Sequence, residues 1–227
     1  GIGSMPNAVG ELIAESDLRD LGMHTELCSD AYLSMYKAGK LTNRKKKIDR
    51  GKGVFGCAIG SPELYEWVDD NHGIAAYPLE YVNRPSVIAQ IDNMVSINSC
   101  VSVDLYGQVA AESSGSRQIS GTGGQLDFLV GASASRGGKA FICMSSVYRD
   151  REGVYHSRIR PQFDGDIITS PRSQIYFLAT EYGVINLEGR STWERAEGLI
   201  SIAHPDFRED LIREAELRKI WRRSNKY

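Results

Sequence analysis

Several features of membrane, secreted and nucleic-acid-binding proteins are missing from this sequence. No apolar run reaches the ~18 residues that a membrane-spanning helix needs, and no basic segment followed by an apolar one marks a secretory signal. The net charge of −2 at pH 7 creates no overall field that attracts nucleic acid or anionic lipid. We therefore expect a cytoplasmic protein that binds neither nucleic acid nor a membrane.

Cysteine pairs are missing as well. The sequence contains 4 cysteines and 4 histidines, all scattered, with no CxxC pair and no cysteine and histidine at the spacing of metal ligands. This pattern predicts buried free thiols in a reducing compartment and no metal site. The cysteines are Cys28, Cys57, Cys100 and Cys143.

The composition is that of a globular protein, with 41% hydrophobic and 25% charged residues. Strand-like segments alternate with helical ones: residues 22–27 and 54–60 read as strands, and residues 29–39 and 61–71 as helices, the second with Ser61 as N-cap and Pro62 in its first turn. Alternation of this kind predicts an α/β fold with an open mixed or parallel sheet flanked by helices. Further strands are expected within residues 74–79, 99–107, 139–146, 155–161 and 173–180, and helices within residues 121–135, 191–203 and 207–223.

Glu26 is the acid of most interest. It lies in "LGMHTELCSD", at the end of a predicted strand and just ahead of a predicted helix. Two glycine turns stand on either side of it in the sequence, "GIGSMP" at residues 1–6 and "SGTGGQLDF" at 120–128. Bare backbone amides at the start of a helix can hold an anion or an oxyanion. A plain surface charge and two plain turns are the alternative interpretation.

Three further features have two interpretations each. Asn83 precedes Arg84 and Pro85, and Pro85 restricts Arg84 to extended backbone. The Asn83 side-chain amide either orients a carboxylate or belongs to a turn. The basic run at residues 44–52 either meets phosphates or forms a solvated loop. In "AHPDFRE", His204 looks catalytic, but we expect the start of a helix with Asp206 near the cap.

Taken in order, seven segments resemble the acetyl-CoA hydrolase/transferase family within the family I CoA-transferases. They are "GIGSMPNAV", "DLGMHTEL-SD", "AQIDNMVSINS", "VDLYGQV", "SGTGGQLDF-VGA", "ATEYGV-NL-GRS" and "IAHPDFRE-L", where a hyphen marks a position outside the match. The sequence is most similar to the 4-hydroxybutyrate and butyryl-CoA:acetate CoA-transferases. The resemblance implies a CoA-transferase (NagB/RpiA-like) domain over residues 1–227. It corresponds to the C-terminal half of the family, and the N-terminal half has no counterpart here.

The resemblance also implies roles for individual residues. Glu26 matches the catalytic glutamate, and Asn83 matches the asparagine that positions it. The backbone amides of Ile2 and Gly124 match the two oxyanion donors. Arg149 is the nearest basic residue to a lysine of the family that this sequence lacks, because "SSVYRDREG" is longer and lysine-free there. The expected CoA contacts are Gly1, Ile2, Gly3, Ser4, Met5, Val101, Gly123, Gly124 and Arg149.

The implied activity is transfer of CoA between a short-chain acyl-CoA and an acetate-like carboxylate. It is ping-pong catalysis through a glutamyl-CoA thioester, with CoA as substrate and no tightly bound cofactor. An acyl-CoA hydrolase on the same scaffold is one alternative, because both reactions use the same residues. A CoA-binding half-domain that is inactive without its partner half is another. The expected partners are an N-terminal half-domain, on the same or a separate chain, and further copies in a homo-oligomer.

Overall fold

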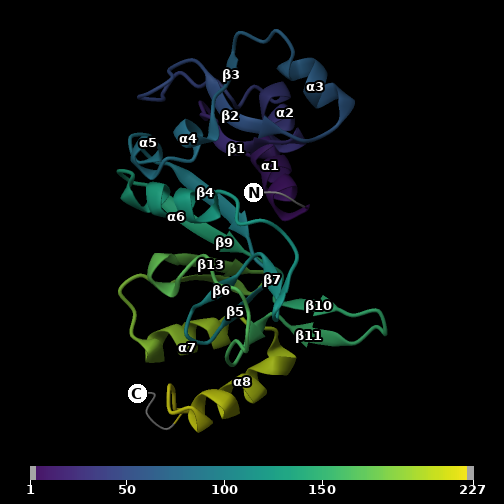
Figure 1. Cartoon of the computed structure of the whole chain (residues 1–227), viewed down its shortest axis with the longest axis vertical. Coiled ribbons are helices and arrows are strands. Elements are labelled where there is room, and N and C mark those ends of the chain that lie inside the picture. The colour runs from purple at the N-terminus through teal and green to yellow at the C-terminus, as the bar shows by residue number, and fades with distance from the viewer. Residues whose placement is uncertain (1–3, 224–227) are drawn as a thin grey trace. The chain divides into compact units, whose positions relative to one another are not determined.

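The computed structural model describes residues 4–223, in two compact units (Figure 1). The first unit lies within residues 1–98 together with 127–139. The second lies within residues 99–126 together with 140–227. Among residues 4–223, no helix combines the length and apolar character needed to cross a membrane.

The first unit is built on a parallel sheet with strand order β1-β2-β3. Its strands are β1 (His24–Cys28), β2 (Gly53–Ala58) and β3 (Ile74–Ala76). Three helices occupy the segments before and between these strands: α1 (Ser4–Glu15), α2 (Asp30–Lys37) and α3 (Pro62–Val68). The alternation predicted for residues 22–71 is therefore confirmed.

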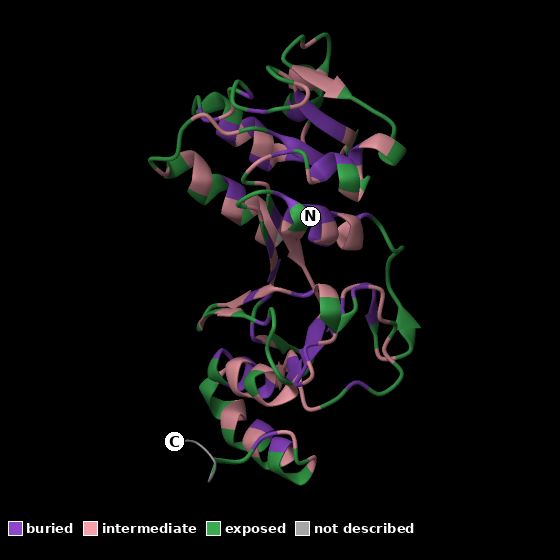
Figure 2. Cartoon of the chain, turned by 90° about the vertical axis from the view of Figure 1, so that its left-hand side faces the viewer, coloured by how far each residue is buried: buried purple, intermediate pink, exposed green. Residues whose placement is uncertain are grey.

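Local chemistry explains how these helices begin and pack. The Ser61 hydroxyl accepts a hydrogen bond from the backbone N–H of Leu64 and caps α3, with Pro62 at the first helical position. Helix α1 approaches α2 closely because Gly10 has no side chain. A Cβ at that position would lie 2.3 Å from the Cβ of Ala31. Buried side chains in and next to these strands and helices form a core: Met23, Cys28, Leu33, Phe55 and Leu64. Figure 2 colours the buried residues of the chain purple.

Two very short helices follow the third strand, α4 (Leu79–Val82) and α5 (Pro85–Ile88). Arg84 separates them in the extended conformation predicted for a residue before proline, with φ −67° and ψ 118°. A longer helix, α6 (Gln125–Ala134), contributes Phe128 to a second core cluster with Val54, Val82 and Ile88. Strand β4 (Val95–Ser99) follows α5 in the chain, and the sequence did not predict it.

The second unit has small sheets. Strand β13 pairs in parallel with β9 and antiparallel with β14, while β5 pairs in parallel with β12 and antiparallel with β6. The unit also has two hairpins, β7–β8 and β10–β11. The bounds are β5 (Ser102–Asp104), β6 (Val109–Ala110), β7 (Ser113–Ser114), β8 (Arg117–Gln118), β9 (Lys139–Cys143), β10 (Val147–Arg149), β11 (Tyr155–Ser157), β12 (Ile159–Arg160), β13 (Phe177–Thr180) and β14 (Gly183–Asn186).

A 3-10 turn, η1 (Arg172–Gln174), precedes β13, and two helices, α7 (Thr192–Ser201) and α8 (Pro205–Leu217), follow β14. Helix α8 begins where "AHPDFRE" predicts a helix. The capping group, however, is the His204 ring, whose Nδ1 accepts from the backbone N–H of Asp206 at 3.3 Å. The predicted strand at 155–161 is divided into two, because β11 pairs with β10 and β12 pairs with β5. The predicted α/β class, with parallel and mixed sheets flanked by helices, is confirmed.

Candidate active site

Glu26 lies in the middle of strand β1, where its neighbours on both sides are buried and it is half-buried. Its Oε1 accepts a hydrogen bond from Asn83 Nδ2 at 3.1 Å. Asn83 is the C-cap residue of helix α4, with φ −89° and ψ −2°. The other amide atom, Asn83 Oδ1, is buried and accepts no hydrogen bond from residues 4–223. The structure thus brings together the two residues that the sequence predicts as nucleophile and positioning amide.

Helix α4 reaches this site because strand β2 has a glycine beside Glu26. In the parallel register, Thr25 pairs with Phe55 and Leu27 pairs with Cys57, which leaves Gly56 level with Glu26. A Cβ on Gly56 would lie 2.3 Å from Cδ2 of Leu79 in α4 and 3.2 Å from the Glu26 carbonyl oxygen. The absence of that Cβ therefore lets the first turn of α4 pack against the strands.

The Glu26 charge acts on two further ionisable side chains of the first unit, and the sequence did not predict either. Burial and the Glu26 charge raise the pKa of Asp127, in α6. The same two causes raise the pKa of Cys57, whose Sγ lies 3.5 Å from the Glu26 carbonyl oxygen. The sequence signal for Asp127 is its place directly after the glycine turn in "SGTGGQLDF".

The prediction that the four cysteines are free is confirmed, but the prediction that all four are buried is wrong. All four cysteines are free, and Cys28 is buried. Cys57 is exposed because the end of β2 emerges from the core, and Cys100 and Cys143 are half-buried. Among residues 4–223, no three His, Cys, Asp or Glu side chains gather closely enough to hold a metal ion.

The two glycine turns differ in how far the structure describes them. Gly1, Ile2 and Gly3 lie outside the described residues. Helix α1 starts at Ser4, and Met5 in its first turn is half-buried. The second turn belongs to the second unit and directly precedes α6: Gly123 has φ +58°, a conformation that favours glycine, and Gly124 is buried. Their predicted contacts with CoA stay predictions.

Val101 and Arg149 lie in the second unit and already have partners there. The backbone N–H of Val101 donates to the Ala110 carbonyl at 2.8 Å, and its own carbonyl accepts from Arg158 Nη1 at 2.8 Å. Arg149 lies in the β10–β11 hairpin, where Nε donates to the Gly153 carbonyl at 2.9 Å. This contact makes Arg149 part of the turn that replaces the expected lysine segment.

The basic run at residues 44–52 is held by interactions within the first unit. Arg44 and Lys45 pair with Asp20, and Lys47 pairs with Asp92. Lys46 is buried, and burial lowers its pKa to about 8. Its Nζ donates to the carbonyls of Met23 at 3.0 Å and Lys52 at 2.7 Å. These contacts favour a structural loop over a phosphate-binding one.

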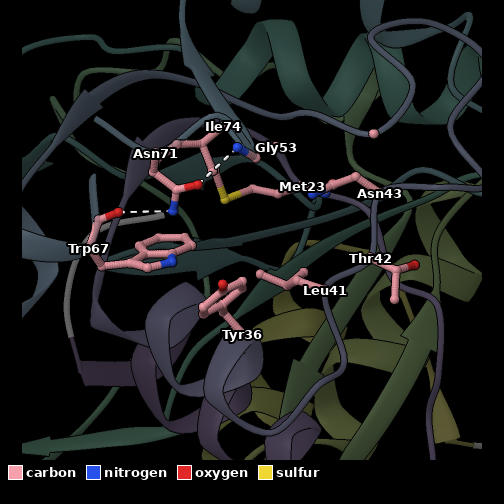
Figure 3. Close-up of a pocket in the computed structure, with 11 residues that line it drawn as sticks. Met23, Tyr36, Leu41, Thr42, Asn43, Gly53, Trp67, Asn71 and Ile74 are labelled. Atoms are coloured by element: carbon pink, nitrogen blue, oxygen red, sulfur yellow. Dashed lines mark hydrogen bonds between the residues drawn. The ribbon is translucent and has the colours of Figure 1, made fainter. Parts of the chain in front are cut away.

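A cavity of about 190 Å³ lies elsewhere in the first unit (Figure 3). Figure 3 shows the rings of Tyr36 and Trp67 on one side of it, with Met23, Leu41 and Ile74 nearby. The cavity forms beside the start of the parallel strands, where Gly53 and Gly73 leave space. Neither Glu26 nor any other predicted site residue lines it. The cavity is therefore separate from the candidate active site.

Comparison with known proteins identifies the family. A model of the acetyl-CoA hydrolase/transferase C-terminal domain matches residues 60–215. The chain belongs to this family. Glu26 lies before residues 60–215, but the relatives that align over the whole chain also cover it. A probable butyrate:acetyl-CoA coenzyme A-transferase from Syntrophomonas wolfei is 56% identical over 227 residues, and the butyryl-CoA:acetate CoA-transferase of Anaerostipes caccae is 53% identical over the same length. Each match covers 100% of the chain and 51% of the relative.

Solved structures share the fold. RipA from Yersinia pestis matches with a TM-score of 0.90 and 41% identity, over 97% of this chain and 49% of that one. A 4-hydroxybutyrate CoA-transferase from Porphyromonas gingivalis matches with a TM-score of 0.79 and 39% identity, over 96% and 50%. The chain therefore spans about half the length of the relatives it matches. The resemblance expected from the seven sequence segments is confirmed.

Proposed function

We propose that this chain supplies the nucleophile of a CoA-transferase that moves CoA between a short-chain acyl-CoA and an acetate-like carboxylate. The observation that supports this most directly is the Glu26 carboxylate held by Asn83 Nδ2 at 3.1 Å. The names of the relatives at 46–56% identity support the reaction class, since each is a CoA-transferase of butyrate, acetate or 4-hydroxybutyrate.

The first half of the reaction transfers CoA to the protein. A Glu26 oxygen attacks the thioester carbonyl carbon, and the carbonyl oxygen becomes a tetrahedral oxyanion. The carbon–sulfur bond then breaks, which releases CoA thiolate and leaves a mixed acyl-glutamyl anhydride. The thiolate attacks the glutamyl carbonyl of this anhydride, the donor's acid leaves as a free carboxylate, and glutamyl-CoA thioester remains.

The second half runs the same steps in reverse with a different acid. The acceptor carboxylate attacks the glutamyl-CoA thioester and releases CoA thiolate, which forms a new mixed anhydride. The thiolate then attacks the acceptor's carbonyl carbon. The new acyl-CoA departs and Glu26 returns as a free carboxylate. Covalent catalysis of this kind follows ping-pong kinetics.

Two physical effects supply the rate. A carboxylate is a weak nucleophile, and holding it aligned with the thioester is worth roughly 7–11 kcal/mol. In the proposal Asn83 provides that alignment. The backbone amides of Ile2 and Gly124 provide the second effect by donating to the oxyanion, at about 2.7–4 kcal/mol for each donor.

Partners and location belong to the same proposal. We assign the reaction to the cytoplasm, with a facing half-domain that closes the acyl site and with further copies of the protein in a homo-oligomer. The length of the relatives, about twice that of this chain, supports the facing half-domain. Hydrolysis would follow if water resolved glutamyl-CoA. Acetyl-CoA hydrolases from yeasts, however, are only 28–29% identical to this chain.

The test is Glu26→Gln in the natural full-length protein. An amide of equal size forms no anhydride, so transfer of CoA to acetate should be abolished while binding of CoA persists. Wild-type protein given acyl-CoA without an acceptor should gain the mass of CoA less one water, and the variant should not. Glu66→Gln, an exposed glutamate in α3, is the matched control and should behave as wild type. Normal turnover by Glu26→Gln would refute the mechanism, and thiol release that is independent of acetate would favour a hydrolase.

A further inference from the structure

His24 lies two residues before Glu26 on strand β1, so both side chains project from the same face of the sheet. The residue is only 5% exposed. Its Nε2 lies 2.8 Å from the backbone carbonyl oxygen of Val82. A carbonyl only accepts, so Nε2 must be the protonated nitrogen of the ring. The other nitrogen, Nδ1, is buried and has no hydrogen-bond partner in residues 4–223.

Val82 directly precedes Asn83, and the two hydrogen bonds therefore act on adjacent residues. His24 holds the Val82 carbonyl, and Asn83 Nδ2 reaches Glu26 at 3.1 Å. Both bonds join the C-terminal end of α4 to the same face of β1. We propose that His24 is a positioning residue that fixes the backbone before Asn83 and, through that amide, aligns Glu26; this rests on the function proposed above.

Helix α4 needs such an anchor because it is only 4 residues long. A single helical turn has too few internal hydrogen bonds to keep its own geometry. The other side-chain anchor of α4 is Tyr81, whose hydroxyl donates to Asp49 Oδ2 at 2.8 Å. The His24 ring lies between Tyr81 and Phe128, with ring centroids 6.4 and 6.2 Å away. This packing keeps the imidazole aimed at the Val82 carbonyl.

The surroundings also disfavour the charged form of the ring. Burial lowers the pKa of His24, and the Lys46 charge lowers it further, while the bond to Val82 and the Asp49 charge oppose them. The charged or titratable groups facing His24 are thus Lys46, Asp49 and Tyr81. A second proton on Nδ1 would find no acceptor among the described residues. The Nε2 proton of His24 is used in the hydrogen bond to the Val82 carbonyl. His24 therefore acts by fixing the backbone at Val82 rather than by exchanging protons with substrate.

Three substitutions in the full-length protein test this assignment. His24→Phe keeps a ring and removes the N–H donor. His24→Asn keeps a polar side chain, but that side chain is too short for its amide to reach the Val82 carbonyl. We expect kcat for CoA transfer to fall about ten- to a hundredfold in both, the size of a small misalignment of reacting groups. The KM for acyl-CoA should change less than about twofold. His24→Gln places an amide nitrogen near the Nε2 position and should recover most of kcat.

Leu33→Ala is the matched control, because Leu33 belongs to the other buried cluster of this unit. It should lower the melting temperature and leave kcat of the folded fraction unchanged. Wild-type kcat in His24→Phe and His24→Asn would overturn the assignment. So would an activity loss that a lower melting temperature explains by itself, with kcat of the folded fraction unchanged as in Leu33→Ala. A His24→Gln variant as slow as His24→Phe would overturn it too. Glu26→Gln, assayed alongside, separates the two proposals: if it turns over normally the proposed function fails, whereas an inactive Glu26→Gln with a fully active His24→Phe refutes only the role of His24.

Discussion

Replacing Asn83 by alanine is the most direct probe of how Glu26 is aligned. The substitution removes the amide nitrogen that lies 3.1 Å from Glu26 Oε1. A hydrogen bond to a charged group contributes about 1.5–3 kcal/mol. Glu26 is half-buried, so water can replace part of the bond, and the lower end of that range applies. At about 1.4 kcal/mol for each factor of ten in rate, we expect kcat to fall about 10- to 30-fold.

The assay is steady-state transfer of CoA to acetate, with melting curves run on the same samples. The KM for acyl-CoA should stay within about twofold, because the lost bond aligns the nucleophile rather than binding CoA. Asn98→Ala is the control, since Asn98 donates to the neutral Ser96 hydroxyl at 2.8 Å in the same unit. Asn83→Asp should be slower than Asn83→Ala, because it places a second carboxylate against Glu26. If Asn83→Ala were as fast as Asn98→Ala, the amide would have no part in aligning Glu26.

Two more predictions concern the glycine turn and the buried histidine. Gly124→Val should lower kcat about a hundredfold or more, as expected for one lost oxyanion donor, and should change the melting temperature little; equal losses would mean a plain structural turn. The second concerns pH: the pKa of His24 is lowered from its ordinary value of 6.5 on folding, so below pH 6.5 the unfolded state binds more protons and the free energy of unfolding must fall. That contribution is complete above pH 6.5 and is lost as the pH drops toward the folded pKa. Urea titrations at pH 7.5 and 5.5 should show a smaller difference for His24→Gln than for wild type, and identical differences would contradict the prediction.

The sequence was sufficient wherever structure depends on neighbouring residues. Ser61 and Pro62 mark the start of α3 because capping and a preset φ act within one turn. Arg84 is extended because the ring of the next residue, Pro85, excludes the helical conformation. The strand containing Glu26 and the helix after it follow from the same local signals. Seven ordered segments also indicated the family, because their combination is specific where each alone is weak, and the match over residues 60–215 agrees.

Only the tertiary structure showed what surrounds Glu26. The resemblance assigned Asn83 its role, but the contact spans 57 residues of sequence and depends on how closely α4 packs against β2. The close approach of α4 to β2 depends on the absence of a Cβ at Gly56. No local pattern distinguishes this glycine from one in an ordinary turn. No local pattern marks His24 or Asp127 as a site residue either. Their roles come from burial and from partners on other elements, and a low-dielectric, crowded environment around a side chain exists only after the chain has folded.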